Sequence, residues 1–169
     1  MPDNSHSVKR ESVKLRLKRF PRRKNIMQPY NAAFFKTHET YFLEIKARYG
    51  EAVALDVMRA VMARNLGAAY DEMGFKRGEP RDFVRVVGER DASVGLEASF
   101  PVVERGRIVY RLHTDPFPGL KDKIAPRKLA ATYMDFKVRH LLGEDWHWWM
   151  SNDLWRGDRC TEYAIERKY

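Results

Sequence analysis

Apolar residues recur at helical spacing in two stretches near the start of the chain, and they predict a pair of helices. The first stretch begins after Asn31, a residue type that caps helices, and ends at Gly50. The second follows at once and stops near Gly74. Because the connection is short, we expect the two helices to lie antiparallel. The apolar stripes consist of Phe34, Phe35, His38, Tyr41, Phe42, Ile45 and Tyr49, and then of Leu55, Met58, Val61, Met62, Leu66 and Ala69.

After this pair the pattern changes to the alternation that is typical of strands. Gly78, Pro80 and Gly88 punctuate the chain and leave room for a short helix over residues 81–87. A third amphipathic helix is predicted to begin at Pro126. This order predicts an α+β fold, with an N-terminal helix pair packed on an antiparallel sheet built from two hairpins with an intervening helix. The first hairpin is predicted to have strands over residues 96–103 and 107–113. The second is predicted to have strands over residues 146–154 and 160–167, which are joined around Arg156-Gly157-Asp158.

Length and composition set the class of the protein. A chain of 169 residues, 44% of them hydrophobic, suits one soluble globular domain with a sizeable core. No apolar run approaches the ~18 residues of a membrane span, and the start of the chain lacks the apolar region of a signal peptide. The single cysteine excludes an internal disulfide and suits a reducing compartment. We therefore expect a cytoplasmic protein with no membrane partner.

The net charge of +9 is concentrated at the start of the chain. Residues 1–24 carry nine Lys and Arg side chains against two acidic ones, which leaves +2 for the rest. We therefore divide the chain into a basic N-terminal arm, residues 1–24, and a single α+β domain, residues 25–169. The arm could be a solvated, mobile terminus, or an edge strand over residues 13–18. It could also bind nucleic acid, whereas the rest of the chain could bind a small molecule or a second copy of itself.

Four side chains could carry acid–base or nucleophilic chemistry: His113, Asp115, His147 and Cys160. His113 could act as a base that Asp115 orients, or Asp115 could bond the backbone of its own turn. Cys160 would need His113 or His147 as its base, and is otherwise an inert buried thiol. These histidines and carboxylates, with Asp158, could hold a metal if the fold assembles them, but their spacing does not require one. No motif indicates a cofactor.

All four tryptophans lie in the last quarter of the chain and could wall a pocket for a flat molecule. Alternation puts Trp146 and Trp148 on one face of a strand, and His147 and Trp149 on the other. One face should pack on the helices and the other could line a cleft, bounded by the break at residues 115–117. The side chains expected to contact a ligand are Phe117, Lys121, Trp146, Trp148, Trp149 and Tyr163; Lys121 could bind a carboxylate or belong to a solvated loop.

The ending Gly157-Asp158-Arg159-Cys160-Thr161-Glu162-Tyr163 and the order of elements resemble the L-2-amino-thiazoline-4-carboxylic acid hydrolase family. More distantly they resemble the 4-vinyl reductase type of small-molecule-binding domain. Thr161 stands where that hydrolase family often has a cysteine, and Asp115-Pro116 where it often has Cys-Pro. The resemblance implies hydrolysis of a cyclic C–N or C–S bond in a small heterocycle. The alternative is a non-catalytic ligand-binding module or an accessory subunit whose basic arm contacts a partner or nucleic acid.

Overall fold

The computed structural model describes residues 28–168, so the basic arm and its predicted edge strand lie outside the described residues. Four strands form one antiparallel sheet in the order β1-β2-β4-β3, which makes β2 and β4 the central strands. The predicted α+β architecture is confirmed. The elements are α1 (Ala32–Tyr49), α2 (Glu51–Met73), α3 (Pro80–Ser93), β1 (Ala98–Glu104), β2 (Arg107–Leu112), η1 (Pro118–Leu120), α4 (Pro126–Leu141), β3 (Trp146–Asn152), η2 (Leu154–Arg156) and β4 (Thr161–Arg167).

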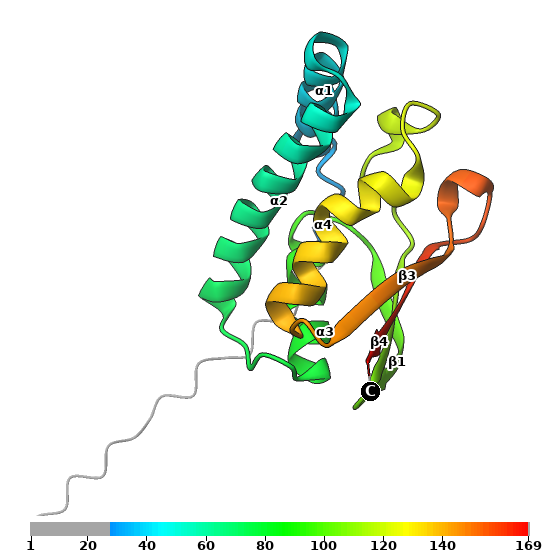
Figure 1. The fold of residues 1–169 in the computed structure, drawn as a ribbon. Coiled ribbons are helices and arrows are strands. Elements are labelled where there is room, and N and C mark those ends of the chain that lie inside the picture. The colour runs from blue at the N-terminus through cyan, green and yellow to red at the C-terminus, as the bar shows by residue number, and fades with distance from the viewer. Residues whose placement is uncertain (1–27, 169) are drawn as a thin grey trace, which may run out of the picture.

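The helices cover one face of the sheet in successive layers (Figure 1). α3 and α4 contact the strands, α2 packs on both of them, and α1 packs on α2 at the outside. The inner face of the sheet is apolar because alternate side chains turn towards the helices, while the outer face carries polar pairs such as Arg111 with Glu162. The buried side chains of the inner face are Ile108, Tyr110, Leu112, Trp146, Tyr163 and Ile165.

Local signals start and stop most elements where the sequence predicts. The side chain of Asn31 accepts a hydrogen bond from the Phe34 amide at 3.1 Å and so caps α1. Gly50, with a φ of 89°, then turns the chain into the antiparallel α2. The last hairpin also forms as predicted, although β3 ends at Asn152 because the next residues make the 3₁₀ turn η2. Gly157 follows that turn in the left-handed conformation, with a φ of 94°.

α3 differs from its prediction, because it runs over 14 residues and Gly88 lies inside it. Interpreting Gly88 as a breaker is wrong. A glycine in a helix costs only about 1 kcal/mol, and α3 offsets this by burying Phe83, Val86 and Val87 under the sheet. The position also suits a small residue, since an added Cβ would lie 3.4 Å from the ring of Phe100.

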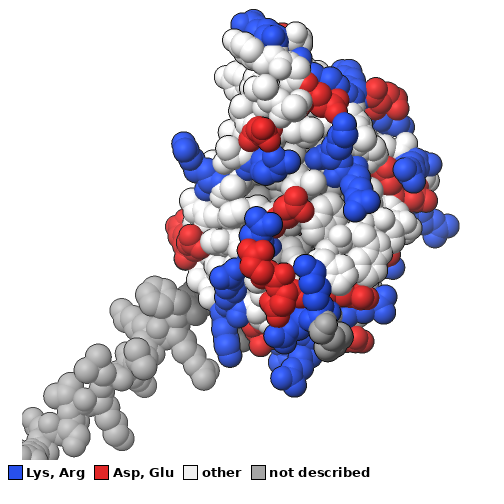
Figure 2. All heavy atoms as spheres, viewed as in Figure 1, with Lys and Arg blue, Asp and Glu red and all other residues white. Residues whose placement is uncertain are grey.

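Charged side chains of both signs are interspersed over the face seen in Figure 2, rather than gathered in one basic patch. This agrees with the low net charge of the chain beyond residue 24. None of the helices in the described part of the chain combines the length and the apolar character that crossing a bilayer requires.

Candidate functional site

A cleft of about 60 Å³ opens between the helices and the sheet, and all four α-helices contribute to it. Leu112 of β2 and Lys137 of α4 are almost fully buried at its floor, whereas His38, Asn65 and Arg90 are more exposed and form its rim. The cleft is therefore largely apolar, with a few polar groups at fixed places. Its apolar lining consists of Phe34, Phe35, Met62, Leu66, Val94, Leu96, Leu112, Pro116, Phe117 and Tyr133.

A buried ionic network lies at the floor of the cleft. Lys137 Nζ lies 3.4 Å from Asp91 Oδ1 and donates to Tyr110 Oη at 3.1 Å, while Tyr110 donates to Asp91 Oδ2 at 2.6 Å. The ammonium also lies 5.0 Å from the ring centre of Tyr110 and 5.6 Å from that of Tyr133. Burial lowers the pKa of Lys137, and the Asp91 carboxylate opposes this shift. The amino group of Lys137 is thus held by one carboxylate and one hydroxyl group at the floor of the cleft.

Two polar groups beside this network have no hydrogen-bond partner among the described residues: Arg90 Nε and Tyr70 Oη, both buried. Burial raises the pKa of Tyr70 well above its usual value and the nearby Asp91 raises it further, while Arg90 acts in the opposite direction. Arg90 itself donates from Nη1 to Ser93 Oγ at 3.0 Å, and its Cζ lies 5.9 Å from the ring centre of Phe34. Buried polar groups normally have partners, and these two are exceptions among the described residues.

A smaller cavity of about 30 Å³ adjoins the cleft, with Leu112, Pro116, Phe117 and Tyr133 as shared walls. Here the 115–117 break meets the last hairpin, because Asp115 Oδ2 accepts a hydrogen bond from Trp155 Nε1 at 2.6 Å. Asp115 Oδ1 accepts from the Phe117 amide at 2.8 Å, so the alternative that Asp115 bonds its own turn is confirmed. Burial raises the pKa of Asp115, and these two donors partly reverse the shift. Of the expected ligand contacts, Phe117 and Tyr163 line this cavity.

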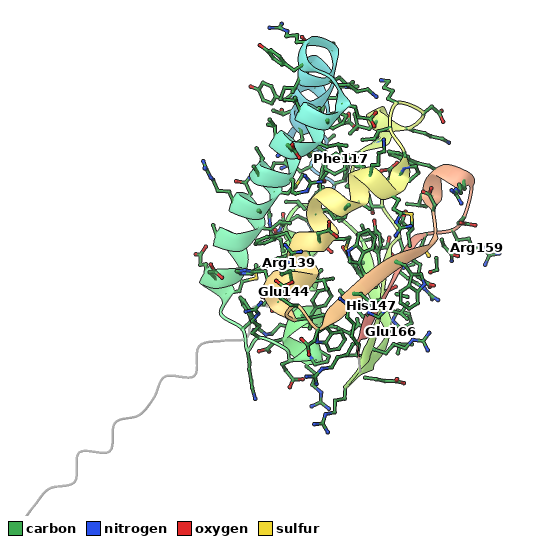
Figure 3. The ribbon with its side chains drawn as sticks, in the orientation of Figure 1. Phe117, Arg139, Glu144, His147, Arg159 and Glu166 are labelled. Atoms are coloured by element: carbon green, nitrogen blue, oxygen red, sulfur yellow. The ribbon has the colours of Figure 1, made fainter. Side chains whose placement is uncertain are left out.

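The structure does not bring His113 and His147 together, so the predicted pairing of these histidines is wrong. His147 is level with Glu166 and Arg107 on the outer face, whereas His113 follows Leu112 at the other end of β2. Six residues of strand separate the two levels, which corresponds to about 20 Å. His147 stacks on Trp149 at 5.6 Å, and His113 Nε2 lies 2.7 Å from Ser99 Oγ. Figure 3 shows His147 beside Glu166 on the last hairpin and Phe117 among the helices.

The other predicted site residues lie apart from the cleft. Cys160 is buried just before β4, at the end of the sheet that carries His113. Trp146 belongs to the core, and Trp148 Nε1 donates to Asp135 Oδ1 at 2.8 Å. Trp149 is 37% exposed on the outer face, so the cleft expected beside it and His147 is not there; the cleft lies on the inner face. Lys121 is exposed in the turn after η1.

Sequence reasoning missed Lys137, Asp91 and Arg90, although a signal was available for two of them. Lys137 stands four residues after Tyr133 and four before Leu141, within the apolar stripe of α4. Asp91 stands four residues after Val87 in α3. A charge at a position that helical spacing assigns to the core indicates a buried, paired group.

Among residues 28–168, no three His, Cys, Asp or Glu side chains are placed to hold a metal ion together. His113 and His147 lie at opposite ends of the sheet, so the set of His113, Asp115, His147 and Asp158 does not come together around one ion. No protein-family model matches this chain, and no curated protein matches its sequence.

Proposed function

We propose that the protein is a small-molecule-binding module, and that a flat, largely apolar molecule of about one ring occupies the cleft between the helices and the sheet. The observation that carries the proposal is the lining: aromatic and aliphatic walls with a fixed polar network at the floor. Ligand sites are typically concave and mostly apolar, with a few polar groups that orient the ligand.

Hydrolysis of a cyclic C–N or C–S bond stays a prediction from the resemblance, and the separation of His113 from His147 gives it no support. Contact of the basic arm with nucleic acid or another partner also stays a prediction, since the arm lies outside the described residues.

A titration monitored by NMR tests the proposal, with benzyl alcohol as a neutral one-ring probe. Binding in the cleft should shift the side-chain amide of Asn65 and the methyl group of Met62, which both line it. Val94→Phe places a ring in the cleft from the half-buried end of α3 and should abolish these shifts. Val53→Phe makes the same change on the exposed side of α2 and should leave them intact. Absence of shifts, or equal shifts in both variants, would contradict the proposal.

A further inference from the structure

Arg90 is the cation of the cleft whose charge the described residues leave unbalanced. Among residues 28–168, no Asp or Glu side chain forms an ion pair with its guanidinium. Within this range its Nε is buried without an acceptor, and the acceptor of its Nη1 is the uncharged Oγ of Ser93. The ring of Phe34 lies beneath the guanidinium, which fixes its position at the rim of the cleft.

The floor of the cleft cannot supply the missing negative charge. Both carboxylate oxygens of Asp91 are already engaged, Oδ1 by Lys137 and Oδ2 by Tyr110. Arg90 is close enough to Lys137 that its charge contributes to lowering the pKa of that lysine. Of the three groups Arg90, Asp91 and Lys137 that line the cleft, Asp91 and Lys137 pair with each other, and Arg90 at the rim has no carboxylate partner among the described residues.

We infer that the cleft selects a small aromatic carboxylate, and that Arg90 is the specificity-determining residue that binds its carboxylate group. The inference rests on the proposed function, because it names the ligand class of the same cleft. A guanidinium binds a carboxylate through two parallel hydrogen bonds, and the two Nη atoms can supply them: Nη1 uses one of its two hydrogens for Ser93 Oγ, and Nη2 makes no hydrogen bond among residues 28–168. The ring of the ligand then lies among the apolar side chains, where Phe34, Leu66 and Phe117 form the walls.

Benzoate and benzamide test the inference, since they have the same shape and differ in charge. In titrations of the full chain, benzoate should bind about tenfold or more tightly than benzamide, because a charge-assisted pair is stronger than a neutral hydrogen bond. Arg90→Gln should bring the two affinities to within a factor of about two. Arg90→Lys keeps the charge but loses the paired donors, and should give an intermediate ratio. Arg81→Gln, on an exposed position of the same helix, should retain the wild-type ratio.

The outcomes separate this inference from the proposed function. If benzamide shifts the cleft resonances at the same concentration as benzoate, the inference is wrong while the cleft remains a binding site. If benzoate preference persists in Arg90→Gln, Arg90 is not the anchor and the inference is again wrong. If neither probe nor benzyl alcohol shifts Asn65 or Met62, both statements fail. Circular dichroism checks the fold of each variant. If Arg90→Gln does not fold, the inference is tested by comparing the benzoate-to-benzamide affinity ratio of the wild type with that of Arg90→Lys, and equal ratios would contradict it.

Discussion

At the scale of single residues, the buried pair of Lys137 and Asp91 occupies positions that helical spacing reserves for apolar side chains. Removing one member of such a pair leaves the other charge buried and uncompensated. Lys137→Met should therefore lower the free energy of unfolding by about 3 kcal/mol in urea denaturation. Adding Asp91→Asn should recover part of this loss, because the stranded charge is gone. A loss below about 1 kcal/mol would show that the pair is not effectively buried.

The residues of β3 and α4 show which parts of the site the sequence could predict. Alternation correctly separates Trp146 and Trp148 from His147 and Trp149, but it says nothing about which level of the sheet each residue occupies. That level depends on the register between β2 and β4, which pairs strands far apart in the chain. The cleft forms where four helices and a strand meet, so the sequence holds only two signals for it: the isolated charges of Lys137 in α4 and Asp91 in α3.

At the scale of elements, local chemistry made most boundaries predictable. Asn31 caps α1 through its side chain, Pro126 begins α4 where its missing amide costs nothing, and Gly157 adopts a positive φ. These signals act over a few residues, so they can be recognised without the fold. The sequence predicts too short a helix for α3, because packing against β1 outweighs the low helix propensity of the glycine inside it.

The same glycine gives a prediction for α3. Gly88→Ala should raise the free energy of unfolding by up to about 1 kcal/mol, because alanine is the better helix former and its Cβ would make an ordinary contact with Phe100. Gly67→Ala in α2 is the comparison, since its Cβ would lie only 3.2 Å from the ring of Phe136. Thermal denaturation should therefore show a smaller gain, or a loss, at Gly67. Destabilisation by Gly88→Ala would mean that the ring of Phe100 cannot adjust.

Glu51 connects three helices, because its carboxylate bonds Lys128 of α4 at 2.7 Å and Lys46 of α1 at 2.9 Å. The hydrogen bonds from Lys128 and Lys46 lower the pKa of Glu51 from 4.5 to about 2. A lowered carboxyl pKa stabilises the folded state above the unfolded pKa, and this contribution is lost as the pH falls from 4.5 to about 2.

Glu51→Gln should accordingly lower the melting temperature at pH 7, and the difference from wild type should shrink as the pH is reduced through this window. Glu44→Gln removes one exposed pair within α1, with Arg48, and should have little effect at either pH. A difference at Glu51 that does not depend on pH would mean that the ion pairs are not its cause.

At the scale of the whole molecule, the layered packing predicts which backbone amides exchange their hydrogens with solvent most slowly. The amides of β2 and β4 lie in central strands, and Tyr110 and Tyr163 there are buried under α3 and α4. α1 packs chiefly on α2 at the outside of the helical layers. The slowest exchange should therefore be found in β2 and β4, and faster exchange in α1. Equal protection of α1 and the central strands would indicate that the molecule opens only as a unit.

The position of β4 has a consequence for how the sheet folds. β4 comes last of the strands along the chain, yet it lies in the middle of the sheet, between β2 and β3. Until residues 161–167 have docked, β2 has an unpaired edge and the tryptophan strand β3 has no neighbouring strand. Because unpaired strand edges promote aggregation, incompletely folded chains should be most prone to aggregate until β4 is in place.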